Sequence, residues 1–279
     1  MSISKGSDDH PEAGPSASPS VGSSIGLLFL LVLGTGVGEV VATAVLPNTT
    51  TATTRLLVAL CIAWPMVLIA AQTLQRAPLC QTFQLRRAPL SSVLVSGVAG
   101  VSLGLLVLSL VTHIPSPAPQ SATDLHEVVS ASNRTALLLA MLVVGPLGEE
   151  LFFRGWMLPV WVRRFGPTWA VVGTTVLFSL LHIFSWRVLL AFPIGLLLGW
   201  ITLTSRSVVP AIIAHSASNS ASTLMDPILR LSGLSSSDIA ALESVPWWLS
   251  VAALLSFGMS LAFLHTRPTS RSVDPRGRS

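Results

Sequence analysis

The sequence contains few charged residues, a single lysine, two cysteines and no tyrosine. Only 10% of its 279 residues are charged, against about 25% in an ordinary soluble domain. This scarcity of charge excludes a soluble globular domain, a disordered chain and a coiled coil. Two cysteines cannot form a disulfide framework, so we expect Cys61 and Cys80 to be free thiols. The net charge of +4 is too small to indicate a nucleic-acid partner.

The sequence has long apolar runs instead. Hydrophobic residues make up 51% of the chain, and the mean hydropathy is +0.72. Because a transmembrane helix needs about 20 mostly apolar residues, these runs predict an all-α, polytopic membrane bundle of about eight transmembrane helices. The predicted spans are 25–46, 56–75, 90–114, 135–161, 168–186, 188–204, 208–225 and 246–265.

The spans divide the chain into five parts. We predict a disordered cytoplasmic tail at 1–24, three N-terminal transmembrane helices at 25–114, a functional core at 135–226, a last transmembrane helix at 246–265 and a basic cytoplasmic tail at 266–279. The first span ends in Ala42-Thr43-Ala44, which is typical of a signal-peptidase site. Its acidic start is not typical of a signal peptide, so we expect the helix to be retained.

Basic residues are distributed unequally between the two sides of the predicted bundle. With eight spans, one side carries eleven Lys and Arg residues and the other carries four. Cytoplasmic loops carry the excess of Lys and Arg, so both termini should be cytoplasmic. The lack of tyrosine and the excess of arginine over lysine are typical of GC-rich coding. We therefore expect a multi-pass protein of a bacterial inner membrane.

Three charged residues interrupt the fourth span, which contains Glu149, Glu150 and Arg154. Each charge at the membrane centre costs about 2.5–3.5 kcal/mol on insertion scales. Glu150 and Arg154 are four residues apart, so they lie on one helix face and can pair. Glu149 is rotated by about 100° from Glu150. The spacing predicts one carboxylate held by arginine and one left for another role, although a purely structural cluster of charges is the alternative.

Two later spans carry polar side chains at helical spacing. Phe178 and His182 are four residues apart, and so are His215 and Asn219. Taken alone, His182 could be a core histidine, and His215 with Asn219 could be hydrogen-bonding contacts between helices. Together with Glu149, they are sufficient for peptide hydrolysis. A carboxylate and an imidazole can take a proton from water, and an imidazole and an amide can donate to an oxyanion.

The three motifs resemble the CPBP family of CAAX proteases and bacteriocin-processing enzymes, also called Abi or type II CAAX prenyl endopeptidase-like proteins. They are Glu149-Glu150-x-x-x-Arg154, Phe178-x-x-x-His182 and His215-x-x-x-Asn219, in this order on successive apolar helices. The resemblance covers about residues 135–226. It implies an eight-helix membrane bundle with an intramembrane catalytic cavity, and the activity of an intramembrane endopeptidase.

The resemblance also implies a role for each motif residue. Glu149 and His182 would activate the attacking water, while His215 and Asn219 would form the oxyanion hole. Glu150 and Arg154 would support the site, and Phe178 would line it. The family mechanism is proposed to be metal-free, so we expect no cofactor. The alternative is Zn²⁺ bound by Glu149, His182 and His215, although the HExxH spacing of zinc proteases is absent.

The expected partners are the lipid bilayer and a membrane-anchored or lipidated protein or peptide as substrate. If the source is bacterial, a myxosortase-like branch that trims C-terminal sorting tails is a candidate. The rival functions are a proton-coupled transporter, because proton relays use intramembrane Glu and His, and a non-catalytic membrane scaffold. The oligomeric state is not predicted.

Two other patterns are interpreted as structural. Gly100-Val101-Ser102-Leu103-Gly104 matches the Gly-x-Ser-x-Gly motif of serine hydrolases, but that motif requires a strand, a turn and a helix. Inside an apolar span, Gly100 and Gly104 predict close helix packing. Glu39 in the first span could line a cavity or pair with an arginine.

Overall fold

The computed structural model describes residues 19–47, 50–112, 133–182, 188–231 and 245–266, and the regular elements within them are helices. The all-α prediction is confirmed for this part of the chain. The α-helices are α1 (Val21–Val45), α2 (Ala52–Gln75), α3 (Leu79–Thr82), α4 (Leu90–Thr112), α6 (Arg134–Leu139), α7 (Gly145–Glu150), α8 (Leu158–Leu180), α9 (Val188–Ser205), α10 (Val209–Leu231) and α12 (Trp247–Thr266). Two π-helices, η1 (Ala140–Val144) and η2 (Leu151–Met157), flank α7.

The helices have the length and composition of membrane spans. Five of the described helical stretches are long and apolar enough to cross a bilayer. The protein is therefore an integral membrane protein with a helical-bundle fold. The first helix begins earlier than predicted, because the Ser20 side chain caps α1 by accepting from the Ser23 amide. Residues 21–24 are thus helical rather than disordered. The rest of the predicted tails at 1–24 and 266–279, apart from residues 19, 20 and 266, lies outside the described residues.

One apolar stretch of 46 residues, Thr135–Leu180, holds two of the predicted spans. It bends at Gly166, whose backbone has φ 76° and ψ 169°. This φ favours glycine, and the following Pro167 is suited to the first turn of a new helix. The bend lies between the predicted spans 135–161 and 168–186, as the sequence indicated. It brings Phe178 back toward the helix that carries the two glutamates.

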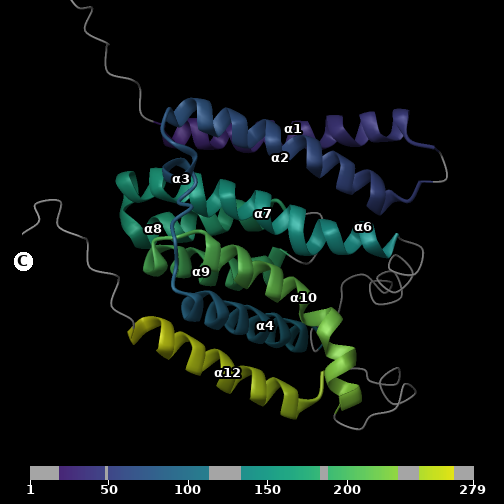
Figure 1. The fold of residues 1–279 in the computed structure, drawn as a ribbon, viewed down its shortest axis with the longest axis vertical. Coiled ribbons are helices and arrows are strands. Elements are labelled where there is room, and N and C mark those ends of the chain that lie inside the picture. Colours follow the sequence, from purple (N-terminus) through teal and green to yellow (C-terminus); the bar gives the residue numbers. More distant parts are fainter. Residues whose placement is uncertain (1–18, 48–49, 113–132, 183–187, 232–244, 267–279) are drawn as a thin grey trace, which may run out of the picture.

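Small residues set the closest approaches between helices. Figure 1 shows α4 between α10 and α12. A Cβ at Gly104 would lie 2.6 Å from the Ser218 carbonyl oxygen of α10, and one at Gly100 would collide with the Ala214 carbonyl. The Gly-x-Ser-x-Gly segment is therefore a packing surface, as predicted. Ser102 donates to Ser256 of α12 over 3.1 Å.

Residues 76–89 form what we call the strap, which crosses the Arg-rich end of the bundle between α2 and α4 (Figure 1). Phe83 of the strap is buried. The Gln84 carbonyl accepts from the Val208 amide over 3.1 Å. The Arg86 carbonyl accepts from the Ser207 hydroxyl over 2.7 Å. The strap thus ties the α2–α4 connection to the α9–α10 connection.

Glu39 pairs with Arg55, with 3.6 Å between carboxylate oxygen and Nε. Two roles are predicted for Glu39, lining a cavity and pairing with an arginine, and the structure shows the second. Both side chains are partly exposed, so the pair lies at the edge of the α1–α2 hairpin and does not belong to the polar group around Glu149.

Candidate active site

The two adjacent glutamates lie on a short α-helix between two π-helices. Glu149 and Glu150 end α7, with η1 before them and η2 after them. A π-helix is often a single-turn insertion at a functional site, since it changes the direction of side chains on either side of it. Gly148, one residue earlier, packs so closely on the Trp64 ring that a Cβ would overlap it. The backbone that carries both carboxylates is thus fixed against α2.

Glu150 and Arg154 form the buried ion pair predicted from their spacing. Arg154 Nη1 donates to Glu150 Oε1 over 2.9 Å, and both side chains are fully buried. Arg154 Nη2 donates to the Gly195 carbonyl of α9 over 3.2 Å. The guanidinium carbon lies 4.4 Å from the Phe178 ring centroid, an arrangement typical of a cation–π contact. Arg154 therefore joins η2, α8 and α9.

His215 of α10 lies between the two carboxylates. Its Nδ1 is 2.9 Å from Glu150 Oε1, and its Nε2 is 3.8 Å from Glu149 Oε2. Because the Glu150 oxygen also accepts from Arg154, we assign the hydrogen of this contact to His215 Nδ1. The longer separation exceeds a hydrogen bond. The Glu149 side chain keeps 18% of its surface exposed, whereas Glu150 keeps none.

The formal charges of this group do not cancel without the histidine. Glu149 and Glu150 carry two negative charges when ionised, and Arg154 supplies one positive charge. A protonated His215 would bring the group to neutrality. It would then present an Nε2–H toward Glu149 and toward any negatively charged atom beside it. Low-dielectric surroundings strengthen such an interaction, so this imidazole is well suited to stabilise developing negative charge.

His182 contacts the group through Phe178. The ring centroids of His182 and Phe178 are 5.2 Å apart, and those of Phe178 and His215 are 5.7 Å apart. His182 Nδ1 lies 3.1 Å from the Phe178 carbonyl oxygen. A carbonyl only accepts, so Nδ1 carries the hydrogen and the neutral ring has its lone pair at Nε2. This tautomer is the one that a general base requires.

Asn219 donates in a direction that the sequence did not predict. Its Nδ2 donates to the Met141 carbonyl of η1 over 2.9 Å. One hydrogen of the amide therefore serves the backbone of the helix that carries Glu149. The predicted role in the oxyanion hole would require the second hydrogen of the same nitrogen. The sequence signal for this contact is Pro146, five residues after Met141.

Aromatic side chains fill the space between the ion pair and the strap. Phe152 stacks on Trp156 with 5.9 Å between ring centroids, and it meets Phe153 edge to face at 5.1 Å. Phe83 belongs to the same buried cluster. A Cβ at Gly155 would lie 2.7 Å from the Phe83 carbonyl oxygen, so the strap lies directly on η2. Packed side chains thus close the site on the side that faces the strap.

The alternative zinc set is not assembled as a metal site. Among the residues that the structure describes, no three His, Cys, Asp or Glu side chains come together closely enough to hold a metal ion. Glu149 and His215 are close to each other, but His182 does not complete a group of three with them. The metal-free mechanism itself stays a prediction.

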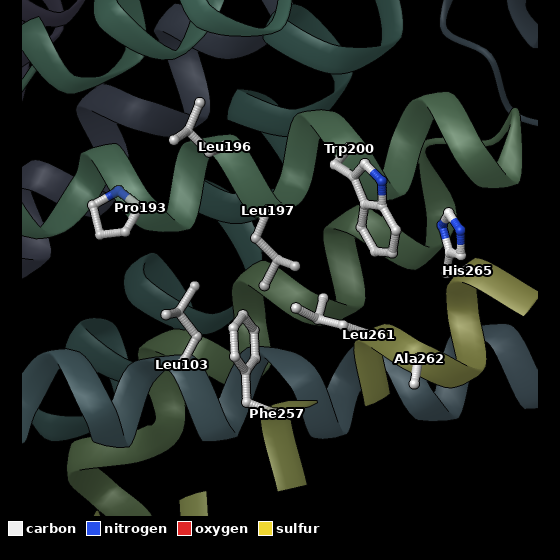
Figure 2. A pocket seen from close by; sticks show the side chains of 9 residues that line it. All are labelled: Leu103, Pro193, Leu196, Leu197, Trp200, Phe257, Leu261, Ala262 and His265. Carbon is white, nitrogen blue, oxygen red and sulfur yellow. The ribbon is translucent and has the colours of Figure 1, made fainter. Parts of the chain in front are cut away.

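A separate apolar pocket of about 590 Å³ lies between α9 and α12. Figure 2 shows Pro193 and Trp200 on α9, Phe257 and His265 on α12, and Leu103 of α4 beside Phe257. Its lining contains none of the predicted catalytic residues. The pocket is thus distinct from the catalytic cavity predicted around Glu149, and that cavity stays a prediction.

Residues 131–221 match the family model described as type II CAAX prenyl endopeptidase Rce1-like. This part of the chain, about a third of its 279 residues, is similar to the CAAX protease family. The match extends from before η1 into α10, and it contains every residue predicted for the site. This family consists of proteases, so the match supports an enzyme that hydrolyses peptide bonds. Comparison with curated proteins and with solved structures finds no match.

Proposed function

We propose that this protein hydrolyses a peptide bond of a membrane-anchored or lipidated protein or peptide within the bilayer. Glu149 and His182 take the proton of the attacking water, and His215 donates to the oxyanion of the tetrahedral intermediate. The proposal rests on the position of His215 between a buried, arginine-held Glu150 and a partly exposed Glu149.

The two carboxylates have different roles in this mechanism. Glu150 has both a guanidinium and an imidazole on one oxygen and no exposed surface, which suits a group that orients its neighbours. Glu149 has exposed surface and no short partner among the described contacts, which suits a group that meets water. Proximity of water, base and oxyanion donor then supplies the catalytic geometry. No metal ion is required by these steps.

We further propose a bacterial inner-membrane location with both termini cytoplasmic, which the basic residues of the strap support. The substrate class that fits this location is a protein held in the membrane by a helix or a lipid. Trimming of a C-terminal sorting tail, as in a myxosortase-like branch, is one form of this activity. The fragments that the protein releases in the cell would show whether the substrate is a C-terminal sorting tail or another membrane-held segment.

The proposal is tested by comparing the termini of membrane proteins by mass spectrometry in the source cell. A deletion strain would be complemented with the wild type, with Glu149→Gln or with Glu39→Gln at matched expression. We expect one protein terminus to appear with the wild type and with Glu39→Gln, and to be absent with Glu149→Gln. Glu39 is a matched control because its partner is Arg55, outside the site.

A terminus that also appears with Glu149→Gln would show that this site does not perform the hydrolysis. If Glu149→Gln restored every phenotype of the deletion, the transporter or scaffold function would replace the protease. Loss of cleavage on chelation, with recovery on adding Zn²⁺, would contradict the metal-free mechanism.

A further inference from the structure

The Met141 carbonyl lacks a helical partner. In η1 the Gly145 amide donates to the Ala140 carbonyl, five residues back. In the same register, the donor to Met141 would be the amide of residue 146. That residue is Pro146, which has no N–H. The π turn and the proline together leave the Met141 oxygen without a backbone donor.

An unpaired carbonyl is costly at this position. Lipid offers no hydrogen-bond partner to a backbone group, so a side chain of a neighbouring helix is a suitable donor. Asn219 Nδ2 lies 2.9 Å from the Met141 oxygen and donates to it. The side chain reaches this oxygen from α10, 78 residues later in the chain. The amide therefore occupies the place of the missing N–H.

The turn that Asn219 holds lies directly beside a glutamate of the site. A Cβ at Gly145 would be 2.8 Å from the Ala140 carbonyl oxygen and 3.6 Å from Glu149 Oε1. A change of register in η1 would thus displace the Glu149 carboxylate relative to His215. Even about 1 Å of such displacement can reduce a catalytic rate by roughly 100-fold.

We infer that Asn219 is a positioning residue that replaces the N–H absent from Pro146 and so fixes the π turn that places Glu149. The inference builds on the proposed function, because the turn places Glu149, the proposed base. It assigns Asn219 a role other than donation to the oxyanion. The two roles of Asn219 differ in one consequence. If the amide replaces the missing N–H, restoring an N–H at position 146 makes the Asn219 amide unnecessary.

The test is a cycle of Asn219→Leu, Pro146→Ala and the double variant. Asn219→Leu is expected to lower the Tm of the purified protein in detergent. It should also reduce the amount of the new protein terminus that cleavage produces in cells, by up to about 100-fold. Pro146→Ala supplies an amide five residues after Met141. We expect it to raise the Tm of the Asn219→Leu variant more than that of the wild type, and to restore most of the cleavage.

Asn133 provides a matched control, because its side chain caps α6 by accepting from the Ala136 amide over 3.2 Å. Asn133→Ala should not be rescued by Pro146→Ala. Additive Tm changes for Asn219→Leu and Pro146→Ala would overturn the inference. So would a double variant with restored Tm but no cleavage, because Asn219 would then act on the substrate. If the wild type itself released no terminus, the proposed function would fail, and the Tm cycle alone would decide the role of Asn219.

Discussion

At the scale of single residues, the buried ion pair makes the site sensitive to loss of one charge. Arg154→Met should destabilise the protein by about 3–5 kcal/mol, because it leaves Glu150 buried without its compensating charge. Adding Glu150→Gln should recover part of this loss, since glutamine removes the charge and still accepts from His215. Thermal unfolding of the purified variants in detergent measures both effects. Equal midpoints for the single and double variants would contradict this account.

The sequence predicts some of these residue contacts better than others. Glu150 and Arg154 pair because a helix places positions four apart on one face, and this rule needs no tertiary information. The position of His215 against Glu150 depends on how α10 packs across α4, which spacing along the chain does not determine. The donation from Asn219 to Met141 requires a π turn, which helical periodicity does not predict.

At the scale of helices, the α4–α10 crossing holds His215 in place. Gly100→Val should abolish cleavage, because a side chain there collides with Ala214, the residue before His215. Ser102→Ala should retain cleavage, because this hydroxyl only donates to Ser256. The amount of the protein terminus that cleavage produces in complemented cells compares the two variants. Loss of cleavage in Ser102→Ala at normal expression would return the Gly-x-Ser-x-Gly segment to the list of catalytic motifs.

The helices themselves are the most predictable feature of the fold. Apolar runs of about 20 residues must cross the bilayer as helices, because lipid offers no partner to backbone groups. The bend at Gly166 lies between two of the predicted spans, 135–161 and 168–186. The strap is different: its basic residues indicated a cytoplasmic loop, while the burial of Phe83 against Gly155 arises only from tertiary packing.

At the scale of the whole molecule, the aromatic side chains packed between the ion pair and the strap predict that the site is accessible from one side only. A membrane-impermeant thiol reagent should label a sole Cys80 in inverted vesicles and not in intact spheroplasts, because Cys80 is exposed on the strap. In a Cys61→Ala, Cys80→Ser background, Glu149→Cys should react faster in spheroplasts than in inverted vesicles. A faster reaction from the strap side would contradict the packing described between Glu150 and Phe83.

The separation of the site residues along the chain has a consequence for biosynthesis. Arg154 follows Glu150 by four residues, so the two charges can neutralise each other while the nascent helix passes from the translocon into lipid. His215 comes 65 residues after Glu150 and arrives with a later helix. The segment with the highest insertion cost therefore carries its own counter-charge, and the group of side chains around Glu149 is completed only after that helix is already in the membrane.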